Sequence, residues 1–338
     1  MTSSLHGSSD PLLTGHRHVL FDLDGVVYRG RSLVPGADTA IDAVRHAGVR
    51  VTFITNNASR APQAVVEHLR GFGVAARADE VVTSAVAAAR FVVEELPDDA
   101  VLPIGGEGLF AALREVGART VASADDGPGV VLMGFGPEVG WRDLAEACIA
   151  VQRGARLVAT NLDVSAPSER GLTPANGALV DVVTAVTGAV PTAVGKPEPV
   201  MYRESTDEPS DVVLVVGDRI DTDMRGANEL GMDTLHVLSG AHGVRDVLQA
   251  PREDRPRYVG LDLGALLEPH PAPTARDDGT WVCGAASARI EADALVLDGV
   301  RGLDQFRAAC SAVWTHRDAG HQVDLAAAEV LDDLLRQV

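Results

Sequence analysis

The stretch HVLFDLDG, residues 18–25, decides how the chain folds. Its apolar run predicts a buried β-strand that ends before the break at Gly25. Asp22 and Asp24 stand two positions apart where this strand ends. A single Asp in such a place is most often a turn or helix-cap residue. Two neighbouring carboxylates, however, repel each other unless a cation lies between them or one of them is protonated. We therefore treat both as candidate catalytic or metal-binding residues.

Short apolar runs alternate with helical patterns along much of the remaining chain. The segment GADTAIDAVRHAG at 36–48 predicts a helix closed by its last glycine, and VRVTFIT at 49–55 predicts the next strand. DVVLVVGD at 211–218 predicts another buried strand. Alternation of this kind is typical of βαβ units. The sequence thus predicts an α/β protein with a Rossmann-like, doubly wound parallel sheet.

Polar residues follow two of these strands directly. Thr55 and Asn56 end the second strand, and Asp218, Asp221 and Asp223 come after the third. The carboxyl ends of parallel strands meet in one crevice, so these side chains are expected to converge with the first pair. A hydroxyl and a backbone N–H suit phosphate oxygens. Three carboxylates suit a hard divalent cation such as Mg²⁺, although one of them is expected to cap the following helix.

Lys196, in AVGKPEPVMY at 193–202, is the only lysine of the 338 residues. A lysine is ordinarily an exposed, solvated residue. In a chain that carries its other positive charges as arginine, that ordinary interpretation loses weight. An ammonium is a compact point charge that a planar guanidinium cannot replace in a narrow site. We therefore treat Lys196 as a candidate anion-binding residue.

Composition changes divide the chain into several segments. A second set of strand and helix patterns interrupts the core, and a run rich in Pro, Asp and Gly precedes the C-terminal patterns. The predicted organisation is a disordered tail at 1–16, a core at 17–84 and 189–268, an inserted α/β cap domain at 85–188, a linker at 269–279, and a small C-terminal α+β unit at 280–338.

The overall composition excludes several classes of protein. A net charge of -19 argues against nucleic acid or an anionic membrane as the partner, since both reward clustered Lys and Arg. Three widely spaced cysteines support neither a disulfide framework nor a zinc site. No apolar run is long enough to span a bilayer, and the start has no apolar segment like that of a signal peptide. A cytoplasmic location is expected, and homo-oligomerisation stays open.

The four motifs D-x-D-G, T-N, K-P and G-D-x4-D, in this order, resemble the haloacid dehalogenase superfamily of aspartyl phosphotransferases. The chain has a long insert between the second and third motifs. This insert, together with the segments TNN, GDRIDTD and ATNLD at 159–163, looks like the NagD or nitrophenylphosphatase-like subfamily with a large C2-type cap. The resemblance covers residues 17–268. It implies phosphatase chemistry, because dehalogenases of the superfamily lack an acid two residues after the nucleophile.

The resemblance also implies roles for the core motifs. Asp22 would be the nucleophile that forms an aspartyl-phosphate, and Asp24 the general acid and base. Mg²⁺ would be held by Asp22, the backbone carbonyl of Asp24 and Asp218, with Asp223 supporting them. Phosphate would be bound by two further motif segments, those of Thr55 with Asn56 and of Lys196.

The cap would select the substrate, since the core motifs contact only phosphate and metal. Asn161, Asp163 and Arg170 match the family's segment that faces the core and are candidate substrate contacts. The C-terminal unit is similar to actinobacterial members with an extension, to which glycerol 3-phosphate is attributed as substrate. The resemblance therefore implies a small phosphorylated metabolite, such as glycerol 3-phosphate, another polyol or sugar phosphate, or phosphoglycolate.

Two other functions share the aspartyl-phosphate. A phosphomutase or phosphotransferase differs only in the fate of that intermediate, and release of free phosphate without a second sugar phosphate would distinguish the two. A receiver-like phosphoacceptor switch is compact, lacks a cap and carries its acceptor on the third strand. The nucleophile candidate here follows the first strand, which disfavours a receiver.

Replacing the single lysine by arginine tests the role of Lys196. In a closed site the guanidinium fork would displace the nucleophile or the phosphate, so Lys196→Arg should lower kcat/KM by about 10² to 10³, comparable with losing one preorganised donor. Lys196→Ala should lower it at least as much. Steady-state kinetics on a phosphate ester, with circular dichroism to confirm folding, measures this. An arginine variant that turns over like the wild type would identify Lys196 as a surface residue or as a charge that tolerates replacement.

Overall fold

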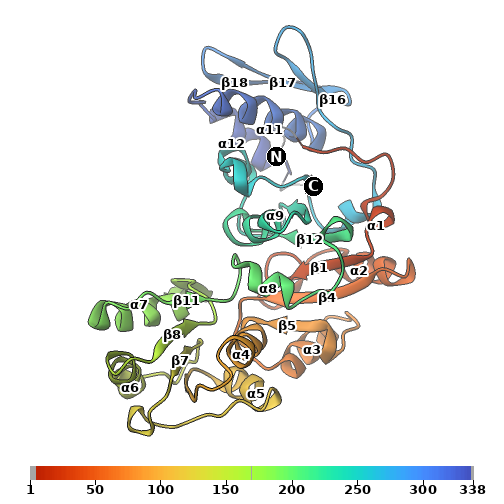
Figure 1. The fold of residues 1–338 in the computed structure, drawn as a ribbon. Helices are drawn as coiled ribbons and strands as arrows, with labels where there is room; N and C mark the ends of the chain where they lie inside the picture. Colours follow the sequence, from red (N-terminus) through yellow and green to blue (C-terminus); the bar gives the residue numbers. More distant parts are fainter. Residues whose placement is uncertain (1–4, 169, 336–338) are drawn as a thin grey trace. The chain divides into compact units, whose positions relative to one another are not determined.

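The computed structural model describes residues 5–168 and 170–335 (Figure 1). The contacts within the chain divide it into two compact units. Unit 1 comprises residues 1–53, 72–74 and 208–338, and unit 2 comprises residues 54–71 and 75–207. The division passes through one strand, β4, so that a single strand contributes residues to both units.

The larger sheet has six strands in the order β14-β13-β12-β1-β4-β5. β1 pairs in parallel with β12, β12 with β13, and β13 with β14. Every residue of β1 and β12 is buried, which is typical of a parallel strand covered on both faces. The α/β fold with a Rossmann-like parallel sheet is thereby confirmed. The strands are β1 His18–Asp22, β4 Arg50–Thr55, β5 Val81–Thr83, β12 Val213–Gly217, β13 Asp233–Val237 and β14 Tyr258–Gly260.

Helix α2, Ala37–His46, shows why the apolar pattern predicted these elements correctly. Its buried residues are Ala37, Ala40, Ile41 and Val44, a spacing that gives one apolar face. The other helices of unit 1 outside the C-terminal segment are α1 Leu12–Gly15, α9 Arg225–Glu229 and α10 Val244–Gln249, and the short strands β2 Tyr28–Arg29 and β3 Ser32–Leu33 form a separate pair.

Unit 2 contains a parallel four-stranded sheet in the order β11-β8-β7-β6. A separate antiparallel hairpin is formed by β9 and β10. The strands are β6 Val101–Ile104, β7 Val130–Met133, β8 Arg156–Ala159, β9 Ser165–Ser168, β10 Gly171–Pro174 and β11 Thr192–Ala193. The helices are α3 Pro62–Gly71, α4 Ser84–Glu95, α5 Glu107–Glu115, α6 Trp141–Gln152, α7 Asn176–Thr187 and α8 Pro199–Arg203.

The predicted cap at 85–188 falls within unit 2, but the contacts also place residues 54–71 there. The reason is a close approach of backbones. Gly108 donates its N–H to the carbonyl of Ser59, and a side chain at Gly108 would overlap the backbone of Ala58 and Arg60. The domain boundaries read from the sequence stay a prediction.

The C-terminal segment forms an antiparallel sheet, β15-β16-β17-β18, with two helices (Figure 1). Helix α11 packs along β16 and β17, and α12 contacts β18. The sequence predicted a small α+β unit over 280–338, and the sheet of the structure begins earlier, with β15. Its elements are β15 Thr274–Ala275, β16 Trp281–Cys283, β17 Ala286–Glu291, β18 Ala294–Gly299, α11 Leu303–Asp318 and α12 Ala326–Leu335.

This C-terminal segment shares a hydrophobic core with the preceding α/β part of unit 1. Phe306 and Trp314 of α11 lie in the same buried cluster as Val247 of α10. The indole of Trp314 donates a hydrogen bond of 3.0 Å to the carbonyl of Val247, and Arg255 forms a two-pronged ion pair with Asp318. The two parts therefore form one packed unit.

The predicted linker and the predicted disordered tail both contain ordered residues. In the linker, His270 is buried and exchanges backbone hydrogen bonds with Ser8. In the tail, Leu5 and Leu12 are buried, so the disordered tail is not what the structure describes over residues 5–16. Isolated apolar residues in polar runs gave no periodic pattern from which this burial could be predicted.

Within residues 5–168 and 170–335, no helix combines the length and the apolar character that crossing a membrane requires.

Removal of the Trp314 side chain tests the shared core. Trp314→Ala leaves a cavity among buried residues, so the free energy of unfolding of unit 1 should fall by about 3–5 kcal/mol. Trp141→Ala is the matched control, because Trp141 is 81% exposed, and should change stability by less than about 0.5 kcal/mol. Urea unfolding of both variants measures the difference. Equal stability of the two variants would mean that α11 is not part of the core of unit 1.

Candidate active site

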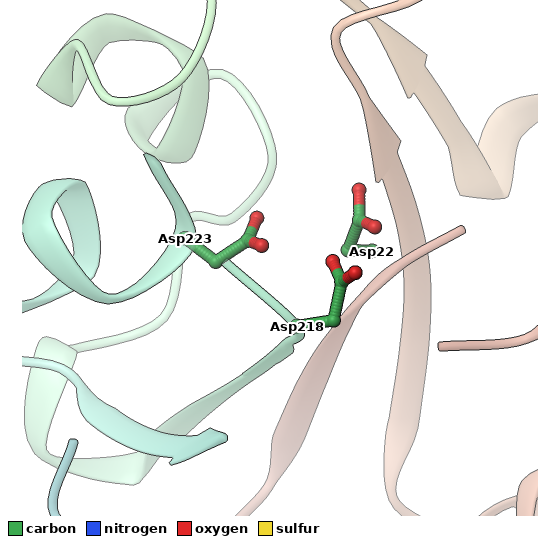
Figure 2. Close-up of side chains that lie close together, drawn as sticks. All are labelled: Asp22, Asp218 and Asp223. Carbon is green, nitrogen blue, oxygen red and sulfur yellow. The ribbon is translucent and has the colours of Figure 1, made fainter. Parts of the chain in front are cut away.

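Three buried carboxylates gather at the carboxyl edge of the larger sheet (Figure 2). Asp22 is the last residue of β1, Asp218 directly follows β12, and Asp223 lies in the helical turn Ile220–Met224. One carboxylate oxygen from each lies within 4.8 Å of the other two. Because β1 and β12 are parallel neighbours, Asp22 and Asp218 emerge side by side.

Backbone donors orient two of these carboxylates. The Ala241 N–H donates a 2.6 Å hydrogen bond to Asp218 Oδ2, and the Arg219 N–H donates one of 3.1 Å to Asp223 Oδ2. Three like charges buried together are costly unless a cation balances them. Carboxylate oxygens are the ligands that a hard divalent cation prefers. The donor set therefore fits Mg²⁺.

Two glycines make room for Asp218. A side chain at Gly240 would overlap the Asp218 carboxylate, and one at Gly25 would do the same. Gly25 also has a φ of +87°, which other residues rarely adopt. Sequence reasoning used Gly25 only as a strand break and missed Gly240 with its neighbour Ala241. The signal that could have indicated them is the run SGAHG after the strand β13.

Asp221, the remaining carboxylate of GDRIDTD, pairs with an arginine and does not join the three-carboxylate cluster. Its carboxylate accepts hydrogen bonds of 3.0 and 2.8 Å from Arg219. Burial would raise the pKa of Asp221, but these hydrogen bonds and the positive charge of Arg219 outweigh burial and lower it. Asp221 is thus held in an ion pair outside the three-carboxylate cluster.

Asp24 is exposed and follows the buried Leu23. The turn after it is fixed by a 2.7 Å hydrogen bond from the Gly25 N–H to the Tyr28 carbonyl, and Ser239 Oγ donates one of 2.6 Å to the Gly25 carbonyl. The side chain of Asp24 is not part of the three-carboxylate cluster. Its predicted contribution to metal binding used only its backbone carbonyl, and that contribution stays a prediction.

The predicted phosphate-binding residues Thr55, Asn56 and Lys196 all belong to unit 2. Thr55 and Lys196 are buried, and Thr55 Oγ1 accepts a 3.2 Å hydrogen bond from the Asn57 N–H. The side-chain amide of Asn56 donates a 2.9 Å hydrogen bond to the carbonyl of Lys196. Two motifs that are 140 residues apart in the sequence are therefore joined directly.

The predicted substrate contacts of the cap lie in two different places. Asn161 donates a 2.7 Å hydrogen bond to the Asn56 carbonyl, and Asp163 accepts one of 3.0 Å from the Asn56 amide. Arg170 is exposed in the turn between β9 and β10. Sequence reasoning missed Ser84, which donates a 2.7 Å hydrogen bond to the same Asn56 carbonyl.

The structure therefore shows two groups of predicted site residues. The cluster of Asp22, Asp218 and Asp223 lies in unit 1, and the group around Asn56 lies in unit 2. That the two groups act on one substrate stays a prediction. The first group can hold a divalent cation and offer a carboxylate nucleophile, and the second can hold an anion.

Comparison with known proteins identifies what this arrangement is similar to. A haloacid dehalogenase-like hydrolase family model matches residues 19–119, and a HAD-hydrolase-like model matches residues 193–266. D-glycerol 3-phosphate phosphatase of Mycobacterium tuberculosis is 39% identical over 311 residues, which cover 90% of this chain and 87% of that protein. Acid sugar phosphatase of Staphylococcus aureus is 39% identical over 256 residues, covering 75% and 97%.

Solved structures of phosphatases have a fold similar to that of this chain. The crystal structure of a glycerol phosphate phosphatase from Mycobacterium tuberculosis in complex with magnesium has a TM-score of 0.82 at 36% identity, covering 90% of this chain and 92% of that one. A p-nitrophenyl phosphatase from Archaeoglobus fulgidus has a TM-score of 0.69 at 30% identity, covering 75% and 98%.

Filling the space beside Asp218 tests the proposed cation site. Gly240→Ala forces Asp218 to move, so the affinity for Mg²⁺ should fall by at least about tenfold, or ~1.4 kcal/mol. Gly15→Ala is the control, because nothing lies within 4 Å of the added methyl group. Calorimetric titration with Mg²⁺ measures the affinity, and circular dichroism confirms folding. A folded Gly240→Ala variant with the affinity of the wild type would place the cation elsewhere.

Proposed function

The chain belongs to the haloacid dehalogenase-like hydrolases and is a phosphoric monoester hydrolase, and we propose that it hydrolyses a small phosphorylated polyol with Mg²⁺. The observation that carries this proposal is the buried cluster of Asp22, Asp218 and Asp223, whose mutual repulsion a bound cation would offset. Glycerol 3-phosphate is the proposed substrate, with related sugar phosphates and phosphoglycolate as the next candidates. In support, the similarity to a D-glycerol 3-phosphate phosphatase extends over 90% of this chain.

In the proposed reaction Asp22 supplies the nucleophile. One of its carboxylate oxygens forms a bond to phosphorus while the bond from phosphorus to the ester oxygen breaks, which gives an aspartyl-phosphate. Asp24 donates a proton to the departing alkoxide. Its exposure is suited to that role, because the leaving group and then a water must both reach it.

The same residues complete the cycle. The Asp24 carboxylate accepts a proton from water, whose oxygen attacks phosphorus and releases inorganic phosphate together with free Asp22. Mg²⁺, held by Asp22, the Asp24 carbonyl and Asp218 with Asp223 supporting them, would offset the negative charge of the phosphoryl oxygens. Thr55, the Asn56 backbone and Lys196 would donate hydrogen bonds to those oxygens.

The choice between hydrolysis and phosphoryl transfer depends on water. A phosphomutase would use the same Asp22 intermediate but return the phosphoryl group to a second sugar phosphate. The named relatives are phosphatases, which favours hydrolysis. A cytoplasmic location and a homo-oligomeric state stay predictions from the sequence.

Phosphate release from a panel of small esters tests this function. The wild type with Mg²⁺ should release free phosphate, with the highest kcat/KM for glycerol 3-phosphate, and EDTA should abolish turnover because the carboxylates then repel the anionic substrate. Asp22→Asn keeps the side-chain volume but removes the nucleophile, so it should fold normally and be inactive. Full turnover without metal, or an active and well-folded Asp22→Asn variant, would contradict the proposal.

A further inference from the structure

We propose that Asn161 and Asp163, in the loop after β8, are positioning residues that hold the phosphate-binding segment Thr55–Asn56 and do not contact the substrate. The inference rests on the proposed function and deepens it, because it assigns the cap a second task besides choosing the substrate. It follows from how the hydrogen-bonding groups of Asn56 are used.

Asn56 makes four hydrogen bonds, all within unit 2. Its side-chain amide donates to Asp163 Oδ2 at 3.0 Å and to the Lys196 carbonyl at 2.9 Å. Its own carbonyl accepts from Asn161 Nδ2 and Ser84 Oγ, both at 2.7 Å. Because two acceptors face the same amide nitrogen, the orientation of the amide is unambiguous. Both amide hydrogens are used, so only the backbone N–H of Asn56 can bind phosphate.

The loop that holds Asn56 is itself rigidly held. Asn176, fully buried at the start of α7, donates a 2.8 Å hydrogen bond to the Asn161 carbonyl. The Asp163 N–H donates to Asn161 Oδ1 at 3.2 Å, and the Gly177 N–H donates to the Asp163 carbonyl at 2.8 Å. A functional group is positioned accurately only when the residues behind it are fixed by their own contacts. The end of β8 therefore provides a firm support.

The segment before Lys196 joins the same support. The Gly195 N–H donates a 2.8 Å hydrogen bond to the Thr160 carbonyl, and a side chain at Gly195 would overlap that carbonyl. A side chain there would also press on Asn56 Oδ1. The ends of β4, β8 and β11 thus meet at one asparagine amide. Two proposed phosphate donors from distant parts of the sequence are set relative to each other by this contact.

The burial and the contacts of the two side chains distinguish positioning from substrate contact. Asn161 is 4% exposed and its amide nitrogen donates to the Asn56 carbonyl, while Asp163 uses a carboxylate oxygen on the Asn56 amide. Phosphoryl transfer depends on placement, and a misplacement of about 1 Å can cost about 100-fold in rate. Loss of either contact should therefore weaken the binding of the phosphate group, which is common to all esters. It should leave the binding of the alcohol group, which differs among them, unchanged.

Substitutions of the two side chains test the inference with inorganic phosphate as the probe. Asn161→Asp replaces the donor by an oxygen that faces the Asn56 carbonyl, and Asp163→Ala removes the acceptor. Both should weaken phosphate binding in the presence of Mg²⁺ by about tenfold, or ~1.4 kcal/mol. Both should also lower kcat/KM by one common factor for every ester of the panel. Asp163→Asn retains an acceptor oxygen and should restore most of the phosphate affinity.

Asp181→Asn, at an exposed position of α7, is the matched control and should leave both quantities unchanged. Melting temperatures show whether a variant is merely unstable. If Asn161→Asp and Asp163→Ala change the ranking of esters but not the phosphate affinity, they contact substrate and the inference is wrong. It is also wrong if neither quantity changes. A wild type that binds phosphate but hydrolyses no ester would refute the proposed function, while the phosphate affinities would still decide the inference.

Discussion

Repulsion among three buried carboxylates is the constraint on which the rest of unit 1 depends. Asp22, Asp218 and Asp223 stand within 4.8 Å of one another, so the chain must supply either a cation or a great deal of compensating stability. The register of the sheet brings the carboxylates together, because neighbouring parallel strands end side by side. Glycine at position 240 and the Ala241 N–H then fix one carboxylate in the space that remains. A divalent cation bound there would therefore stabilise the folded unit.

Unit 2 contains the proposed phosphate donors, which are Thr55, the Asn56 backbone and the ammonium of Lys196. Hydrogen bonds among its polar residues converge on Asn56, whose amide nitrogen and backbone carbonyl are both used, whereas its Oδ1 is buried without a hydrogen-bond partner among the described residues. Buried networks of this kind are rigid when complete and costly when broken. The insert therefore contacts a segment that carries a proposed phosphate donor. Its own parallel sheet ends in loops that form hydrogen bonds with the Asn56 segment.

The C-terminal segment enlarges the hydrophobic core of unit 1. Trp314 and Phe306 fill the same apolar cluster as α10, and Arg255 ties the end of α11 to the core through Asp318. A chain of this composition could have carried a loosely attached appendage. Shared burial makes the segment a structural part of the unit instead, and the similarity to a relative over 90% of this chain includes a large part of it.

The sequence by itself determined the core strands β1, β4 and β12, the order of the motifs and the candidates Asp22, Asp218 and Asp223, because strand burial and carboxylates near strand ends are local patterns. Tertiary structure alone decided which carboxylate of GDRIDTD pairs with Arg219, that Asn161 and Asp163 bind Asn56, and that α11 packs on α10. Those outcomes depend on contacts between residues up to about a hundred positions apart or on the direction of a side chain within a turn. Periodicity and spacing carry no information about either, since each is fixed only when the chain is packed.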